Sequence, residues 1–157
     1  MVKPFLNTYY HTMAAHADRE TYTFWEHMYR VSQHKTHEEA WFLMETRWML
    51  YLEEGDTLSL LKTIPRDWME DGKEIVLENV KSYFGPLYVR TYSHLDEGTI
   101  GATIKCDTSK KLKEVVVRLP HPEEKTPKRV LGGTYDTRTE SITISNFTGQ
   151  AEVLLEF

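Results

Sequence analysis

The sequence predicts a mainly β protein, an antiparallel β-sandwich preceded by two helices that form a hairpin. Two observations support this fold class. Residues 4–52 carry apolar side chains at helical spacing, whereas residues 74–157 hold short alternating segments separated by turn residues. We therefore expect a helical segment over residues 1–55 and a C-terminal sandwich over residues 56–157. The stretch from Arg47 to Asn79 joins them.

The composition is that of a folded protein, and it excludes two classes of partner. The 157 residues are 40% hydrophobic and 27% charged, enough to bury the core of one domain. A net charge of -5 without a basic cluster gives no attraction to phosphate backbones, so we expect no nucleic-acid partner. No apolar run approaches the roughly 18 residues of a spanning helix, so we expect no membrane partner. A single Cys106 excludes an internal disulfide.

Apolar residues at steps of four predict the first helix. Pro4 suits the first helical turn, and Phe5, Tyr9 and Met13 then fall on one face. Residues 18–27 mix threonines, rings and charges without a regular period. We interpret them as an ordered loop, because so many rings bury too much area to stay in water.

The second helix is expected from a capping box and an apolar body. Thr36 and Glu39 have the spacing in which each side chain satisfies a backbone N–H of the first turn. The body, Ala40 to Leu52, is apolar around nearly its whole circumference, which indicates burial on several sides. One neighbouring helix and one sheet cannot provide that burial. We therefore expect the helices to associate, either with a second copy of the chain or with further helices that precede Met1.

The remaining elements are short strands. Leu58 to Ile64 reads as a strand, Pro65 opens a short helical turn through Trp68, and Asp71 and Gly72 form a turn. Later strands are expected between turn signals at Glu74–Leu77, Leu87–His94, Thr99–Lys105, Glu114–Leu119, Lys128–Leu131, Ser141–Ser145 and Ala151–Phe157.

Motifs in and after the joint resemble a known architecture. Ile64 to Trp68 reads IPRDW, and an Asp-Gly-Lys turn and a Tyr-Phe-Gly-Pro run follow it. A Val-Arg-Leu-Pro strand, a Gly-Gly turn and an Ile-Thr-Ile strand come later. In this order they resemble the C-terminal part of bacterial glycoside hydrolase-like proteins, in which an (α/α)6 toroid precedes a β-sandwich. The resemblance implies that the helical segment is the last hairpin of a toroid whose other helices lie outside this sequence. It also implies a periplasmic or extracellular location.

The loop between the helices holds the candidate site residues. Glycoside hydrolysis generally needs two carboxylates across the scissile bond, and Asp18 and Glu26 are the candidates here. Arg19, Tyr22 and Trp25 are candidate substrate-binding residues, because sugar rings stack on aromatic side chains. By resemblance, this loop would form one wall of the toroid's cleft. The alternative is that the rings belong to the core and the charges to a solvated rim.

Other candidate sites have simpler interpretations. The pairs His34/His37 and His11/His16 have no convincing third ligand, so we expect no metal and no cofactor. Cys106 has no partner typical of a nucleophile and is expected to be a packed thiol. Tyr88 and Tyr92 share one strand face. They could stack on sugars, but a face packed against the helices explains them more simply.

These observations lead to one main hypothesis and two alternatives. The main hypothesis is a C-terminal accessory region of a glycoside hydrolase-like protein, inactive alone, whose partner is carbohydrate. The first alternative is a free-standing carbohydrate-binding or protein-interaction module. The second is a small homo-oligomer that forms through the helices and has no role in sugar chemistry.

Overall fold

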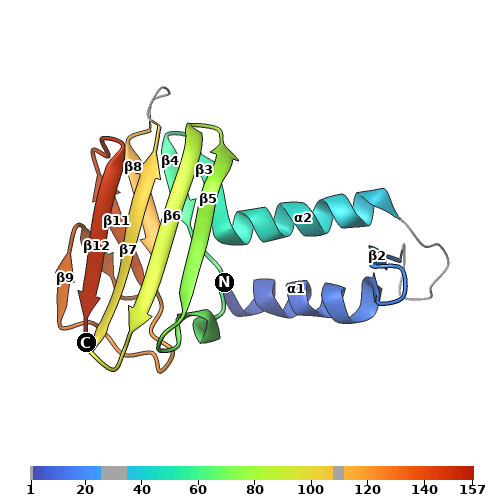
Figure 1. Ribbon diagram of the computed structural model, residues 1–157, viewed down its shortest axis with the longest axis horizontal. Helices are drawn as coiled ribbons and strands as arrows, with labels where there is room; N and C mark the ends of the chain where they lie inside the picture. The colour runs from blue at the N-terminus through green and yellow to red at the C-terminus, as the bar shows by residue number, and fades with distance from the viewer. Residues whose placement is uncertain (1, 26–34, 108–111) are drawn as a thin grey trace.

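The expected fold class is confirmed: two N-terminal helices precede two β-sheets (Figure 1). The structure is a computed structural model and describes residues 2–25, 35–107 and 112–157. Helices α1 (Val2–His16) and α2 (Thr36–Leu50) run side by side away from one edge of the sandwich. A small sheet of β1 (Ala17–Asp18) and β2 (Thr23–Phe24) lies at their far end.

The two helices touch along one face only. The ring of Tyr9 stacks on Phe42 at a centroid distance of 4.8 Å, and its hydroxyl shares a hydrogen bond of 2.9 Å with Thr46 Oγ1. Phe24 also packs against Phe42, with ring centroids 5.0 Å apart and planes inclined by 36°. Tyr9 is accordingly buried in α1, while most of the remaining helix surface faces away from the other helix.

The predicted limits of α2 are wrong at both ends. Lys35, not Thr36, is the N-cap, and no side chain caps the helix. The carbonyl of Lys35 accepts hydrogen bonds from the N–H groups of Glu38 and Glu39, so the helix starts one residue earlier than a Thr36 cap would allow. At the other end, Tyr51 adopts an extended backbone and opens strand β3 (Tyr51–Glu54). The helical segment therefore ends at Leu50 instead of residue 55.

The sandwich consists of two five-stranded sheets. Sheet I has the order β10-β11-β8-β4-β3, and sheet II has the order β5-β6-β7-β12-β9. Besides β3, sheet I contains β4 (Thr57–Leu60), β8 (Glu114–Arg118), β10 (Thr134–Asp136) and β11 (Ser141–Ser145). Sheet II contains β5 (Glu74–Ser82), β6 (Gly85–His94), β7 (Thr99–Cys106), β9 (Arg129–Leu131) and β12 (Gln150–Glu156).

The pairing is antiparallel as expected, except that β4 and β8 are parallel. Parallel neighbours require a long crossover, and here the chain leaves β4, forms β5, β6 and β7 of the opposite sheet, and then returns as β8. The strands β1, β2, β3 and β10 were not expected from the sequence, whereas each strand that was predicted is present.

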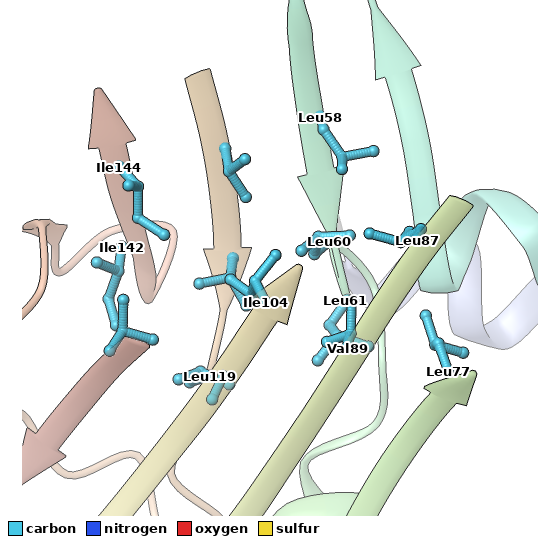
Figure 2. Close-up of a cluster of buried hydrophobic side chains, with 14 of the residues drawn as sticks. Leu58, Leu60, Leu61, Leu77, Leu87, Val89, Ile104, Leu119, Ile142 and Ile144 are labelled. Atoms are coloured by element: carbon cyan, nitrogen blue, oxygen red, sulfur yellow. The ribbon is translucent and has the colours of Figure 1, made fainter. Parts of the chain in front are cut away.

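The core lies between the two sheets (Figure 2). Inward residues alternate along each strand, for example Leu58 and Leu60 on β4 and Leu87 and Val89 on β6, and all four are fully buried. Each such side chain contributes about 1.5 to 3 kcal/mol of burial free energy. The period-two pattern read from the sequence therefore specifies which side of each strand faces the core.

A network of one buried and two partly buried charged side chains stabilises the joint, the stretch from Arg47 to Asn79. Pro65 precedes the short 3-10 helix η1 (Arg66–Met69), as predicted. Arg66 binds Glu140 Oε1 at 2.6 Å and Oε2 at 2.9 Å, and Arg118 on β8 binds Oε2 at 3.0 Å. Arg118 is 5% exposed and also donates to the Ile64 carbonyl at 2.9 Å. The network connects η1 to strand β8 and to the turn before β11 in sheet I.

The root of the helical hairpin is equally well anchored. Arg47 in α2 donates to both carboxylate oxygens of Glu53 at 2.7 Å, and its guanidinium lies 4.5 Å from the ring centroid of Tyr51. Glu53 also accepts the N–H of Tyr83 from the turn after β5, at 2.8 Å. Met49, 1% exposed, packs into the core. These contacts fix the end of α2 that adjoins the sandwich.

Away from this root, the hairpin leaves apolar side chains in solvent. Trp41 is 58% exposed and Leu43 is 68% exposed, contrary to the burial expected for this helix. Exposed large apolar residues on the hairpin are Tyr10, Met13, Tyr22, Trp41, Leu43 and Met44. In the described ranges, neither helix is long and apolar enough to cross a membrane.

Candidate functional site

Of the candidate residues in the interhelical loop, Asp18, Arg19 and Tyr22 lie in the first strand and the turn at the tip of the hairpin, and Trp25 directly follows β2. Ala17 pairs with Phe24 and Asp18 with Thr23, so this part is a short antiparallel hairpin where the sequence suggested an irregular loop. Tyr22 has a left-handed backbone with φ of 57° and donates its N–H to the Asp18 carbonyl at 2.9 Å. Its side chain is 92% exposed, because the turn directs the ring outward.

Three of the candidate residues share one hollow. Asp18, Arg19 and Tyr22 line a depression of about 460 Å³, together with apolar residues of both helices. Trp25 does not line it; its backbone N–H instead donates to the His16 carbonyl at 2.8 Å and extends the hairpin. Glu26 lies outside the described residues. The structure therefore brings together Asp18, Arg19 and Tyr22.

Asp18 is placed to hold the turn together. Its Oδ1 accepts the backbone N–H of Glu20 at 2.9 Å, and the residue is 9% exposed. This hydrogen bond within the turn gives Asp18 a structural role. Of the described residues that line the hollow, Asp18 alone is acidic. Glycoside hydrolysis would need a second carboxylate about 5 to 10 Å away.

The outer face of sheet II holds a second group of candidate residues, whose surroundings differ from those expected from the sequence. Tyr88 and Tyr92 do share a face of β6, as predicted, but neither α1 nor α2 lies over that face (Figure 1). Both helices leave the sandwich at the edge formed by β3 and β5. The expectation that these tyrosines pack against the helices is therefore wrong. The two-residue alternation of side chains along the strand predicts that the tyrosines share a face, but it does not predict whether helices cover that face.

Tyr92 lies over a glycine of the neighbouring strand. The residue pairs with Gly101 on β7 and with Glu74 on β5. A methyl group placed on Gly101 would overlap the Cζ, Oη and Cε2 atoms of the Tyr92 ring. The ring therefore lies across β7, and the missing side chain of Gly101 makes room for it.

The buried titratable groups of the sandwich have the environments of structural residues and not of reactive ones. Burial lowers the pKa of the Arg118 guanidinium, and the hydrogen bond that Arg118 donates to Glu140 opposes this effect. Burial likewise raises the pKa of the Cys106 thiol, which favours the unreactive protonated form. His121 is 4% exposed, and burial lowers its pKa. Its Nδ1 accepts the Glu123 N–H at 3.0 Å, so the neutral ring has a defined partner.

No group of three or more metal-ligating side chains comes together among residues 2–25, 35–107 and 112–157. His34 lies outside these ranges. His11 and His16 both lie on α1, and neither gains a third ligand there.

Comparisons with known proteins assign no family. No protein-family model matches the sequence, and no curated protein matches it. The resemblance to glycoside hydrolase-like proteins therefore remains a prediction from the motifs of the joint, and the function has to be argued from the exposed hairpin and the outer face of sheet II.

Proposed function

We propose that this chain is the C-terminal, non-catalytic part of a larger glycoside hydrolase-like protein. In this role the sandwich supports a helical domain that acts on carbohydrate, and the hairpin is the last helix pair of that domain. One observation carries the proposal: the hairpin is firmly anchored to the sandwich, yet it exposes large apolar side chains such as Trp41 and Leu43.

The exposed residues are difficult to explain for an isolated hairpin. The helices use one face for each other, through Tyr9 and Phe42. Trp41 packs only edge-on against Trp48, with ring centroids 6.4 Å apart, and stays 58% exposed. Trp41 and Leu43 are two positions apart on α2 and point about 200° apart around it, so more than one side of the helix is uncovered. Exposed apolar side chains of this size mark an interaction surface. Further helices packed beside the pair would bury them, as in any helical bundle.

A separate hollow lies at the root of the hairpin. A depression of about 540 Å³ lies between the start of α1 and the outer face of sheet I. Its lining includes apolar side chains, hydroxyls and charged groups: Val2, Leu60, Val116, Ser59, Ser141, Thr139, Lys62, Arg118, Arg138 and Glu140. Thr63, which also lines it, has a buried Oγ1 without a hydrogen-bond partner. An additional segment packed here could fill the space and satisfy that hydroxyl.

The nucleotide sequence upstream of the Met1 codon tests whether further helices of the same protein cover the exposed side chains of the hairpin. We expect an in-frame continuation that encodes further helical hairpins with apolar faces. An upstream sequence without any such reading frame would overturn the proposal. If the isolated chain then formed a defined dimer, the second copy of the chain would be the occupant of the hairpin surface.

Sedimentation velocity of the isolated chain tests the exposed surface itself. We expect the wild type to self-associate with rising concentration, because its apolar surface is uncovered. The double variant Trp41→Gln and Leu43→Gln should stay monomeric, since glutamine keeps helix propensity while removing the apolar area. Tyr83→Gln is the matched control: Tyr83 is 62% exposed but lies on the sandwich, so this variant should associate like the wild type.

A further inference from the structure

The uncovered face of sheet II has the features of a small binding site around Tyr92. A shallow hollow of about 320 Å³ lies there, lined by Tyr92, His94, Arg90, Glu74 and Thr103 and by the turn at Gly72 and Lys73. These residues come from three adjacent strands and the turn before β5. A volume of this size is at the lower end of the range of ligand sites.

The centre of the hollow is a single aromatic ring held in place by the sheet. Because Tyr92 lies across Gly101, one side of its ring is supported by the backbone of β7. The imidazole of His94 lies beside it, with ring centroids 5.2 Å apart and planes inclined by 39°. A ring fixed in this way provides a flat apolar contact at low entropic cost.

Polar groups surround this ring. Arg90 donates from Nε and Nη2 to Glu74 Oε2 at 3.1 and 2.9 Å, which orients both planar groups at the rim. Within the described part of the chain, the side chains of Tyr92, His94 and Thr103 make no hydrogen bond to protein. Donors and acceptors on several sides of the ring are thus available to a ligand in exchange for water.

We propose that this hollow binds a pyranose ring of an uncharged glycan. The C–H groups on one face of such a sugar would lie on Tyr92, and its hydroxyls would exchange hydrogen bonds with Arg90, Glu74 and His94. A pyranose has an apolar face and a rim of hydroxyls, which matches an isolated aromatic ring with polar neighbours.

The charges of the hollow favour a neutral ligand. The guanidinium of Arg90 is already paired with Glu74, and Lys73 is paired with Glu70 at 2.6 Å. No cation of this group is left without a counter-charge, so an acidic sugar would meet no net attraction.

A protein partner fits this surface less well. Stable protein interfaces bury about 800 Å² on each side around an apolar centre. Here the apolar centre is one ring, and charged or polar side chains adjoin it directly. The site requires only the sandwich, so it does not depend on the proposed helical domain.

Affinity gel electrophoresis of the full chain tests the site. The probes are gels that contain soluble β-glucan, xylan or galactomannan, and a polygalacturonate gel represents an acidic glycan. We expect retardation in at least one neutral gel. Tyr92→Leu should weaken binding by about tenfold or more, because leucine still covers Gly101 but offers no ring. Tyr88→Leu, on the same face of β6, is the matched control and should bind like the wild type.

An NMR titration with the oligosaccharide of the retained glycan locates the binding. The amide of Gly101 should shift on binding in the wild type and in Tyr88→Leu. Absence of retardation in every neutral gel, retardation only by polygalacturonate, or equal loss in both variants would overturn the proposal. A change in self-association by Tyr92→Leu without sugar binding would identify the face as a protein contact instead. The hairpin variants leave this assay unchanged, so the two proposals fail separately.

Discussion

The strongest stability prediction concerns Glu140, which neutralises a buried arginine. Glu140→Gln keeps the size of the side chain but removes the charge that faces Arg118, which is 5% exposed, and Arg66. The remaining partner of Arg118 is the Ile64 carbonyl. Removal of one member of a buried ion pair costs about 3 to 5 kcal/mol. Since the side chain of Arg66 keeps 28% exposure, we expect a loss near the lower limit, about 3 kcal/mol.

Urea denaturation at neutral pH measures this loss, followed by tryptophan fluorescence and circular dichroism together to check two-state unfolding. For a chain of this length, the expected loss corresponds to a fall in Tm of roughly 6 to 12 °C. Glu156→Gln is the control, because its pair with Arg129 is 3.4 Å long and solvent-exposed, and it should cost at most about 0.5 kcal/mol.

A double variant separates two contributions to the loss of stability in Glu140→Gln: the unpaired charge of the buried Arg118 and the lost hydrogen bonds. Arg118→Met in the Glu140→Gln background removes the buried charge, so the combined loss should be smaller than the sum of the two single losses. If the free energy of unfolding of Glu140→Gln lies within about 0.5 kcal/mol of the wild-type value, the loss is no larger than that of an exposed ion pair, and the role assigned to the network is wrong.

Two further predictions concern the sandwich. Gly132→Ala should destabilise the protein by about 3 kcal/mol or more in the same urea assay, because φ is +87° and an added Cβ would overlap the backbone carbonyl of Glu152; a loss below about 1 kcal/mol would contradict this. The lowered pKa of His121 means that the unfolded chain, with its pKa of 6.5, binds the proton more readily than the folded protein. Stability should therefore fall as the pH drops below 6.5, and His121→Asn, whose side-chain oxygen can still accept the Glu123 N–H, should show a weaker dependence.

The sequence predicted the sandwich well because its evidence is local. Alternation such as Leu58 and Leu60 or Ile142 and Ile144 reports directly which side of a strand is buried. The sequence did not predict the end of α2 at Leu50, because the apolar run continues into strand β3 at Tyr51 without a helix-breaking residue. It also missed β10, which is three residues long and pairs only with β11.

The features that the sequence did not predict are contacts between residues far apart in the chain, about which local sequence patterns carry no information. The parallel pairing of β4 with β8 and the binding of Arg66 and Arg118 to Glu140 join residues far apart in the chain. The position of Tyr92 over Gly101 likewise follows from strand register. Periodicity placed Tyr88 and Tyr92 on one face, but the direction in which the helices leave the sandwich decides that this face is open.

Hydrogen exchange of the isolated chain, diluted until it is monomeric, tests the central claim most directly. If the hairpin normally packs beside further helices, amides of α2 around Trp41 to Met44 should exchange much faster than those of β6 and β7, and protection should increase with association. Protection of α2 equal to that of the sandwich in a monodisperse monomer would show that the hairpin needs no cover, and would contradict the proposed role.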